Sequence, residues 1–144
     1  MTIKSLKPSL AFNGNCAKAI ALYEMALGAK VEQLVHFGDG EKMGHPFDSK
    51  DKALVLNAVL RIGGGELMMM DSPRSRTVPT ESNVQIFLDF DDVAQLEKSF
   101  GALAEGGKVN MPIADTFWGS RFGMVADAFG IHWMLSHELR KGAK

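Results

Sequence analysis

Apolar residues recur every three or four positions in two stretches of the chain, and this spacing predicts two amphipathic helices. The first stretch follows Asn13 or Asn15, either of which suits a helix start, and it ends at Gly28. The second follows aspartates 91–92 and ends at glycines 106–107. The apolar positions are Cys16, Ala19, Ile20, Tyr23 and Leu27 in the first stretch, and Val93, Leu96, Phe100 and Leu103 in the second.

Short apolar runs rich in β-branched and aromatic residues flank each predicted helix and predict strands. One run precedes each helix, PSLAF at 8–12 and VQIFLDF at 84–90. Three further runs follow each helix: 29–37, 53–62 and 66–71 in the first half, and 108–114, 120–127 and 131–136 in the second. Each half therefore reads strand–helix–strand–strand–strand.

The two halves are copies of one repeat. Residues 10–31 align with residues 88–109, and the identities fall at a strand end, a helix stop and the start of the next strand. We place the first βαβββ module at 5–72 and the second at 83–138, and expect the two to form one domain.

A module with four strands and one helix covers only one face of its sheet, so the other face must pack or enclose a ligand. The sequence therefore predicts an α+β fold in which two βαβββ modules form a curved mixed sheet with a ligand cleft. Two polar segments interrupt the pattern. Residues 38–52 form either a lid or an ordinary surface loop, and residues 71–83 join the modules.

Composition narrows the class of protein. The 144 residues carry 16 basic and 17 acidic side chains, and 46% of residues are hydrophobic, which fits a globular domain and gives no basic footprint for nucleic acid. The chain has no run of about 18 apolar residues for a membrane span. Its start is a poor signal peptide, and a single cysteine forms no internal disulfide, so we expect a cytoplasmic protein.

Three strings carry a resemblance to a known family: FNGNCAKAIALYEMALGA, TFWGSRFGMVADAFGIHWML and LMMMDSP. Together they resemble the PhnB-like branch of the vicinal-oxygen-chelate superfamily, which includes glyoxalases, bleomycin-resistance proteins and ring-cleaving dioxygenases. The resemblance covers residues 5–138. It implies paired βαβββ modules, usually assembled as a homodimer, which agrees with the repeat found from the sequence alone.

The resemblance also implies where a metal would be held, because catalytic members of the superfamily bind a divalent ion through the first and last strands of each module. The corresponding positions here are Lys7–Ser9, Met69, Gln85 and Met134. We expect Met69 and Met134 to be counterparts, since each lies four residues after a glycine of its hairpin. A thioether is a poor ligand for such metals, so we expect no metal cofactor.

Strand alternation then predicts which side chains line the cleft. The expected ligand-binding residues are Ser9, Met69, Asp71, Gln85, Phe87, Asp89, Trp118, Arg121, His132 and Met134. His132 has three readings: a core histidine, a general base or ligand contact, or a metal ligand. Trp118 and Arg121 either clamp a ligand, or pack and pair with a carboxylate.

We expect a homodimer that binds a small, partly apolar molecule without metal, and we assign no catalytic residue. The alternative is a lyase, isomerase or dioxygenase that uses a divalent metal, for which His132, Gln85, Asp71 and Glu66 are the nearest ligands. A demethylubiquinone methyltransferase is less favoured, because the sequence has no glycine-rich strand-to-helix turn for a methyl donor. A purely structural role is also open.

Overall fold

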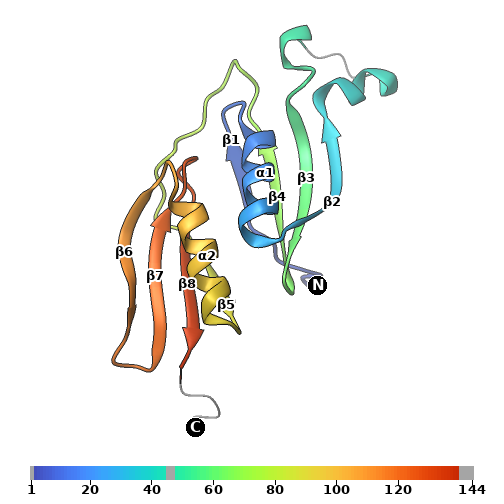
Figure 1. Cartoon of the computed structure of the whole chain (residues 1–144). Helices are drawn as coiled ribbons and strands as arrows, with labels where there is room; N and C mark the ends of the chain where they lie inside the picture. The colour runs from blue at the N-terminus through green and yellow to red at the C-terminus, as the bar shows by residue number, and fades with distance from the viewer. Residues whose placement is uncertain (1, 45–47, 140–144) are drawn as a thin grey trace. The chain divides into compact units, whose positions relative to one another are not determined.

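A computed structural model describes residues 2–44 and 48–139. The chain divides into two compact units, Met1–Val78 and Pro79–Lys144, and the division falls within the predicted 71–83 connection. Each unit holds a four-stranded mixed sheet and one α-helix, which is the predicted α+β class (Figure 1).

The first unit contains sheet A. Its elements are β1 (Ser9–Phe12), α1 (Cys16–Leu27), β2 (Lys30–His36), η1 (Phe37–Met43), η2 (Ser49–Asp51), β3 (Val55–Ile62) and β4 (Gly65–Asp71). The strand order is β1-β4-β3-β2, with β1 parallel to β4 and the other pairs antiparallel. The predicted polar segment 38–52 includes the short 3-10 helices η1 and η2. Its residues 45–47 lie outside the described part, so the choice between lid and surface loop stays open.

The second unit repeats this plan as sheet B. Its elements are β5 (Gln85–Phe90), α2 (Val93–Ala104), β6 (Lys108–Asp115), β7 (Ser120–Ala126) and β8 (His132–Glu138). The order is β5-β8-β7-β6, with β5 parallel to β8. The repeat seen in the sequence is therefore also a repeat of strand order and strand direction.

A buried carboxylate holds the start of α1. Asn15 occupies the N-cap position, but its side chain makes no capping bond. Instead Asp71, at the end of β4, accepts hydrogen bonds from the backbone N–H groups of Gly14 at 2.9 Å and Cys16 at 3.0 Å. Its other oxygen accepts from Val55 N at 3.0 Å. One side chain thus satisfies donors from the β1–α1 turn, the helix start and β3.

The second unit also has a capped helix and a buried carboxylate, but different residues supply them. Asp92, one of the two aspartates that the sequence offers as caps, caps α2 through its own side chain, which accepts from Gln95 N at 2.9 Å. The buried carboxylate is Asp127, in the β7–β8 turn. It accepts from the indole Nε1 of Trp133 at 2.9 Å and from two backbone N–H groups of its own turn.

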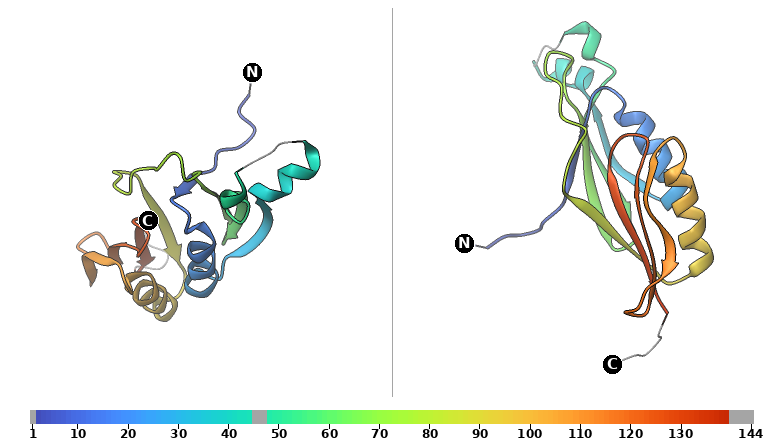
Figure 2. Two further views of the ribbon diagram at one scale, coloured as in Figure 1. Left: turned by 90° about the horizontal axis from the view of Figure 1, so that it is seen from above. Right: turned by 90° about the vertical axis from the view of Figure 1, so that its left-hand side faces the viewer.

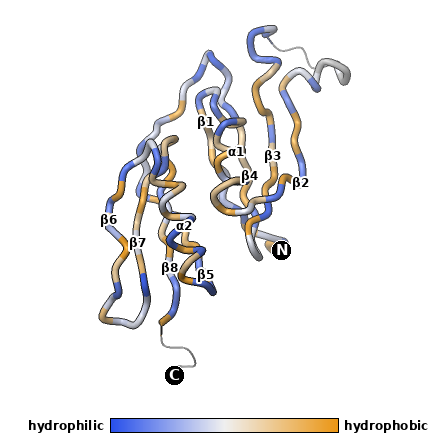
Figure 3. The backbone as a smooth tube through the Cα atoms, viewed as in Figure 1, coloured by the Kyte–Doolittle hydropathy of each residue, from blue (hydrophilic) through white to orange (hydrophobic). Residues whose placement is uncertain are grey.

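Each helix lies across one face of its own sheet (Figures 1 and 2). The core of each unit lies between that helix and that face. In the first unit it includes Ala19, Ile20, Tyr23, Ala58, Leu60, Leu67 and Met69, and in the second Leu96, Phe100, Leu103, Val125, Trp133 and Leu135. Figure 3 shows the contrast between the hydrophobic β3 and the mostly hydrophilic segment that follows β4.

Among the described residues, the two α-helices are each 12 residues long, and neither they nor the shorter 3-10 helices are long and apolar enough to cross a bilayer.

Candidate functional site

The face of sheet B opposite α2 is the first candidate surface, and Gly123 identifies which side chains belong to it. A Cβ on Gly123 would lie 2.8 Å from the Phe100 ring of α2, so this position of β7 faces the helix. Its cross-strand partner Leu135 faces the same way, and so does Leu88, the partner of Leu135 on β5. The alternate positions therefore form the face that α2 does not cover, here called the open face of sheet B.

A row of four apolar side chains crosses this open face in register. Met111 of β6 pairs with Met124 of β7, Met124 pairs with Met134 of β8, and Met134 pairs with Phe87 of β5. Phe87 is 56% exposed and Met111 is 37% exposed. Cross-strand neighbours on one face lie about 5 Å apart, so the four side chains form a continuous apolar strip. Methionine adapts its shape to a partner and makes favourable contacts with aromatic rings.

Aromatic side chains lie along one margin of this strip. Trp118, in the β6–β7 turn, meets Phe117 edge-to-face with ring centroids 5.0 Å apart, and meets Phe122 with centroids 6.0 Å apart. Phe122 belongs to the open face because it pairs with Ser136 and lies two residues before Met124 on β7. Trp118 stays half exposed. It therefore offers an aromatic surface next to the strip.

Polar side chains lie in the rows on either side of the apolar strip. Gln85 and His132 are paired across β5 and β8, and Asp89 and Ser136 are paired four residues further along. All four share the open face with Phe87 and Met134, since they lie two residues from them. An apolar centre with a few polar groups at its margin is the ordinary composition of a small-molecule site.

The open face of sheet A has a different chemistry. An ion-pair network crosses it: Arg61 binds Glu32 at 2.7 Å and Glu66 at 2.9 Å, and Lys7 binds Glu66 at 3.3 Å. The bond from Arg61, followed by contributions from Glu66 and Lys7, lowers the pKa of the Glu32 carboxyl. Charges that are already paired leave this face with less to offer a ligand.

Two expected cleft residues lie on the other side of sheet A. Met69 is fully buried, and Asp71 is 2% exposed with its carboxylate at the start of α1. Both therefore face the helix. The prediction placed them on the same face as Ser9, and that placement is wrong. Ser9 and its cross-strand partner Met68 occupy the open face instead.

The error has a structural cause. Ile62 pairs with Gly65, so the β3–β4 turn has two residues, whereas Ala126 pairs with His132, so the β7–β8 turn has five. Counting from the hairpin glycines therefore shifts the register by one. The counterpart of Met134 is Met68, since the two pair with the equivalent residues Phe87 and Ser9.

Arg121 also faces the helix side of its sheet. Its guanidinium donates to Glu97 of α2 at 2.8 Å and to Asp115 of β6 at 2.9 Å. The bond to Asp115, with that to Glu97, raises the pKa of Arg121 above its ordinary value. Of the two readings of Arg121, the structure shows the carboxylate pairing, and it places the side chain on the face of sheet B that α2 covers.

The remaining expected residues lie together on the open face of sheet B or beside it: Gln85, Phe87, Asp89, Trp118, His132 and Met134. Sequence reasoning missed Met111 and Met124. Register irregularities in β6, between Val109 and Met111 and again before Ala114, disturb the alternation that would have identified Met111.

Cys16, on the helix stripe, is fully buried. Burial, and then the charge of Asp71, raise the pKa of its thiol to about 12. A thiol that stays protonated is a weak nucleophile, so Cys16 acts as a core residue here.

A divalent metal does not suit the side chains at the family's metal positions. They present the Ser9 hydroxyl, the thioethers of Met68 and Met134, and the amide of Gln85. Thioethers are soft donors, which oxygen-preferring metals and zinc disfavour. Glu66, a carboxylate on sheet A's open face, is bound by Arg61 and Lys7.

The strand order, the paired βαβββ modules and one open face per sheet define a protein of the glyoxalase-like class. The comparison with protein families agrees: residues 5–135 match the model of the Glyoxalase/Bleomycin resistance protein/Dioxygenase superfamily. The chain belongs to this superfamily.

Individual relatives extend the comparison. Protein YjdN of Escherichia coli K12 is 34% identical over 140 residues, which cover 91% of this chain and 93% of YjdN. The crystal structure of protein PA1353 from Pseudomonas aeruginosa is 38% identical, with a TM-score of 0.80 over 93% of this chain and 98% of that one. The PhnB protein of Bacillus cereus, at 18% identity, shares the fold with a TM-score of 0.74 over 93% of this chain and 99% of its own.

Proposed function

We propose that the chain binds a small, partly apolar molecule on the open face of sheet B, without a divalent metal. The observation that carries the proposal is the row Met111–Met124–Met134–Phe87, which places four apolar side chains in register on a surface that α2 does not cover. Exposed apolar strips of this kind mark interaction sites on soluble proteins.

The surrounding groups indicate how a ligand would be oriented. Trp118 supplies an aromatic surface along one margin of the strip, and Gln85 and His132 supply hydrogen-bonding groups along the other. In this proposal His132 contacts the ligand, one of the three roles left open by the sequence. The cleft expected between the two modules stays a prediction.

A homodimer is the second part of the proposal. The family resemblance supports it, and so does the exposed apolar side chain of Val84, which lies beside β5, an edge strand of sheet B. Light scattering at micromolar concentration is expected to give twice the 15.7 kDa chain mass, and a monomer mass would contradict this part alone.

The β1–α1 turn gives no support to a methyltransferase. A methyl donor would need free N–H groups at such a strand-to-helix turn. Here the N–H groups of Gly14 and Cys16 are bound by the Asp71 carboxylate, so the turn already holds an internal anion.

A neutral fluorescent probe, N-phenyl-1-naphthylamine, tests the binding proposal. We expect it to bind after exhaustive EDTA treatment, and we expect Met124→Gln to weaken binding because a polar amide then interrupts the strip. The matched control is Met70→Gln on the open face of sheet A, since Met70 is also partly exposed. Equal losses in both variants, or binding that requires added divalent metal, would contradict the proposal.

A further inference from the structure

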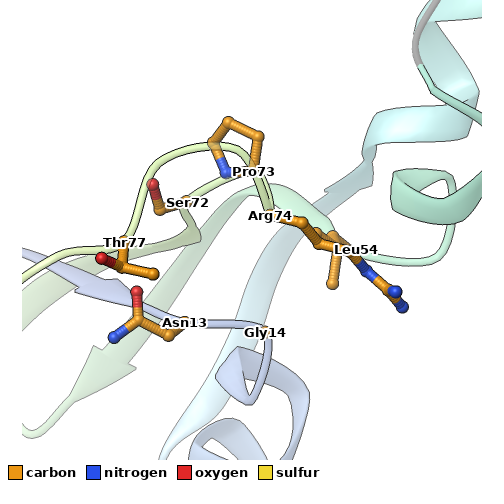
Figure 4. A pocket seen from close by; sticks show the side chains of 7 residues that line it. All are labelled: Asn13, Gly14, Leu54, Ser72, Pro73, Arg74 and Thr77. Atoms are coloured by element: carbon orange, nitrogen blue, oxygen red, sulfur yellow. The ribbon is translucent and has the colours of Figure 1, made fainter.

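A pocket of about 390 Å³ lies within the first unit (Figure 4). It is found where β1 turns into α1 and where the chain leaves β4. Its lining residues are Asn13, Gly14, Leu54, Ser72, Pro73, Arg74 and Thr77. The volume is at the lower end of the range for small-molecule sites.

Hydrogen bonds hold one wall of this pocket in place. The Asn13 side chain donates to Val78 O at 2.9 Å and accepts from Val78 N at 2.8 Å. The Ser72 hydroxyl donates to the carbonyl of Arg76 within the same loop. The backbone N–H of Ser72 donates to the Phe12 carbonyl at 2.7 Å, so residues 72–78 are anchored at both ends. A wall held in this way reduces the entropic cost of binding.

Arg74 is the single charged residue in the lining. Its Nε lies 3.7 Å from the Asp51 carboxylate, which is too long for a hydrogen bond. The Asp51 side chain is 11% exposed, and its Oδ1 has no hydrogen-bond partner among the described residues. Arg74 itself is 67% exposed, so its guanidinium is accessible to a ligand.

We propose that this pocket binds a small organic acid. Arg74 holds its carboxylate, and Leu54 and Pro73 contact its apolar part. A guanidinium matches the two oxygens of a carboxylate, so arginine is well suited to this recognition. Arg74 and Leu54 both line the pocket, so one ligand has a charged and an apolar contact available to it (Figure 4). This site is independent of the one proposed on sheet B.

Substitutions of Arg74 and of Asp51 test the proposal, because they should change the affinity for an acid in opposite directions. A ligand carboxylate and Asp51 compete for the same guanidinium. Arg74→Gln should therefore weaken binding of an acid roughly tenfold, the usual worth of a charge-assisted hydrogen bond. Asp51→Asn keeps the shape of the side chain, removes the competing charge, and should tighten binding by about two- to fivefold.

Benzoate is the probe, and benzamide is its uncharged control. We expect benzoate to shift the backbone amide resonances of Gly14, Leu54 and Thr77, and benzamide to bind more weakly. Arg76→Gln is the matched variant, because Arg76 is an exposed neighbour that does not line the pocket.

Equal affinities for benzoate and benzamide, or equal effects of Arg74→Gln and Arg76→Gln, would overturn the proposal. Shifts confined to the residues of sheet B would overturn it as well. Arg74 is mostly exposed, so Arg74→Gln is expected to fold. If the NMR spectrum shows that Asp51→Asn does not fold, the affinity of Arg74→Gln for benzoate decides whether the proposal holds.

Discussion

The two units share one scaffold and differ in the surfaces they present. In each, the first strand pairs in parallel with the last, and a helix covers one face of the sheet. The equivalent open faces carry ion pairs around Arg61 in sheet A and an apolar strip around Met124 in sheet B. The repeat thus preserves strand order, strand direction and a largely apolar core beneath each helix, while the open faces differ.

The internal supports have diverged as well. Asp71 connects β4 to the β1–α1 turn, whereas Asp127 stays within its own β7–β8 turn and reaches Trp133. A buried carboxylate is needed in each unit because backbone N–H groups would otherwise be buried without acceptors. The two carboxylates accept from such donors at different places in their units.

Asp71→Asn should give the largest effect on stability. An amide keeps one acceptor but turns an NH₂ group toward a backbone donor, which we expect to cost about 3 kcal/mol in the free energy of unfolding. Urea unfolding measures this, with Asp89→Asn on the exposed margin of sheet B as the control. Labelling of Cys16 by a thiol reagent at pH 8 should accelerate in Asp71→Asn, because its thiol is buried in the intact unit. A loss below about 1 kcal/mol would show that Asp71 does not hold the turn.

Gly123→Ala tests the helix-facing side of sheet B. Its new Cβ would lie 2.8 Å from the Phe100 ring and 2.9 Å from Ile113, and such overpacking costs about 2 kcal/mol. Gly101→Ala, on α2 with open space around its Cβ, should instead stabilise the protein by up to about 1 kcal/mol. Thermal unfolding of both variants checks the opposite signs, and a neutral Gly123→Ala would contradict the assigned face.

Phe87→Ala compares the two open faces at equivalent positions, since Phe87 and Ser9 occupy the same place in the repeat. We expect the affinity for N-phenyl-1-naphthylamine to fall roughly tenfold, because a large part of the apolar contact is lost. Ser9→Ala should leave the affinity unchanged. Similar responses at both positions would remove the proposed difference between the faces.

Arg61→Gln should have the smallest of these effects, a change in the pKa of Glu32. The low pKa of Glu32 depends first on its bond to Arg61, so the variant should raise that pKa toward the ordinary value. Because a lowered pKa stabilises the ionised form, the contribution of this pair is present above the ordinary glutamate pKa and is lost as pH falls through the lowered one. Side-chain carboxyl NMR across a pH titration measures the shift. If the pKa of Glu32 is the same in Arg61→Gln as in the unchanged protein, the bond to Arg61 does not lower it.

The sequence predicted the elements and the repeat well, because periodicity reports which side chains face a core. It placed the β5 residues Gln85, Phe87 and Asp89 on one face, and their exposure alternates with that of Ile86, Leu88 and Phe90. It failed at Met69 and Asp71, where the register depended on turn lengths that a single sequence does not reveal.

The capping of α1 shows a second limit. Asn13 and Asn15 are suitable caps by residue type, but the acceptor comes from Asp71, 55 residues beyond Cys16. Asn13 instead fixes the loop at Val78. Local propensity cannot identify a partner that only the folded sheet brings near. The same applies to Met111 and Met124, whose strip exists only through cross-strand register.

Methionine methyl groups offer the most direct test, because they lie on both open faces. In protein with ¹³C-labelled methionine methyls, treated with EDTA, N-phenyl-1-naphthylamine should shift the resonances of Met111, Met124 and Met134. The resonances of Met68 and Met70 should stay in place. Shifts at Met68 and Met70 alone, or shifts that appear only after a divalent metal is added, would contradict the account.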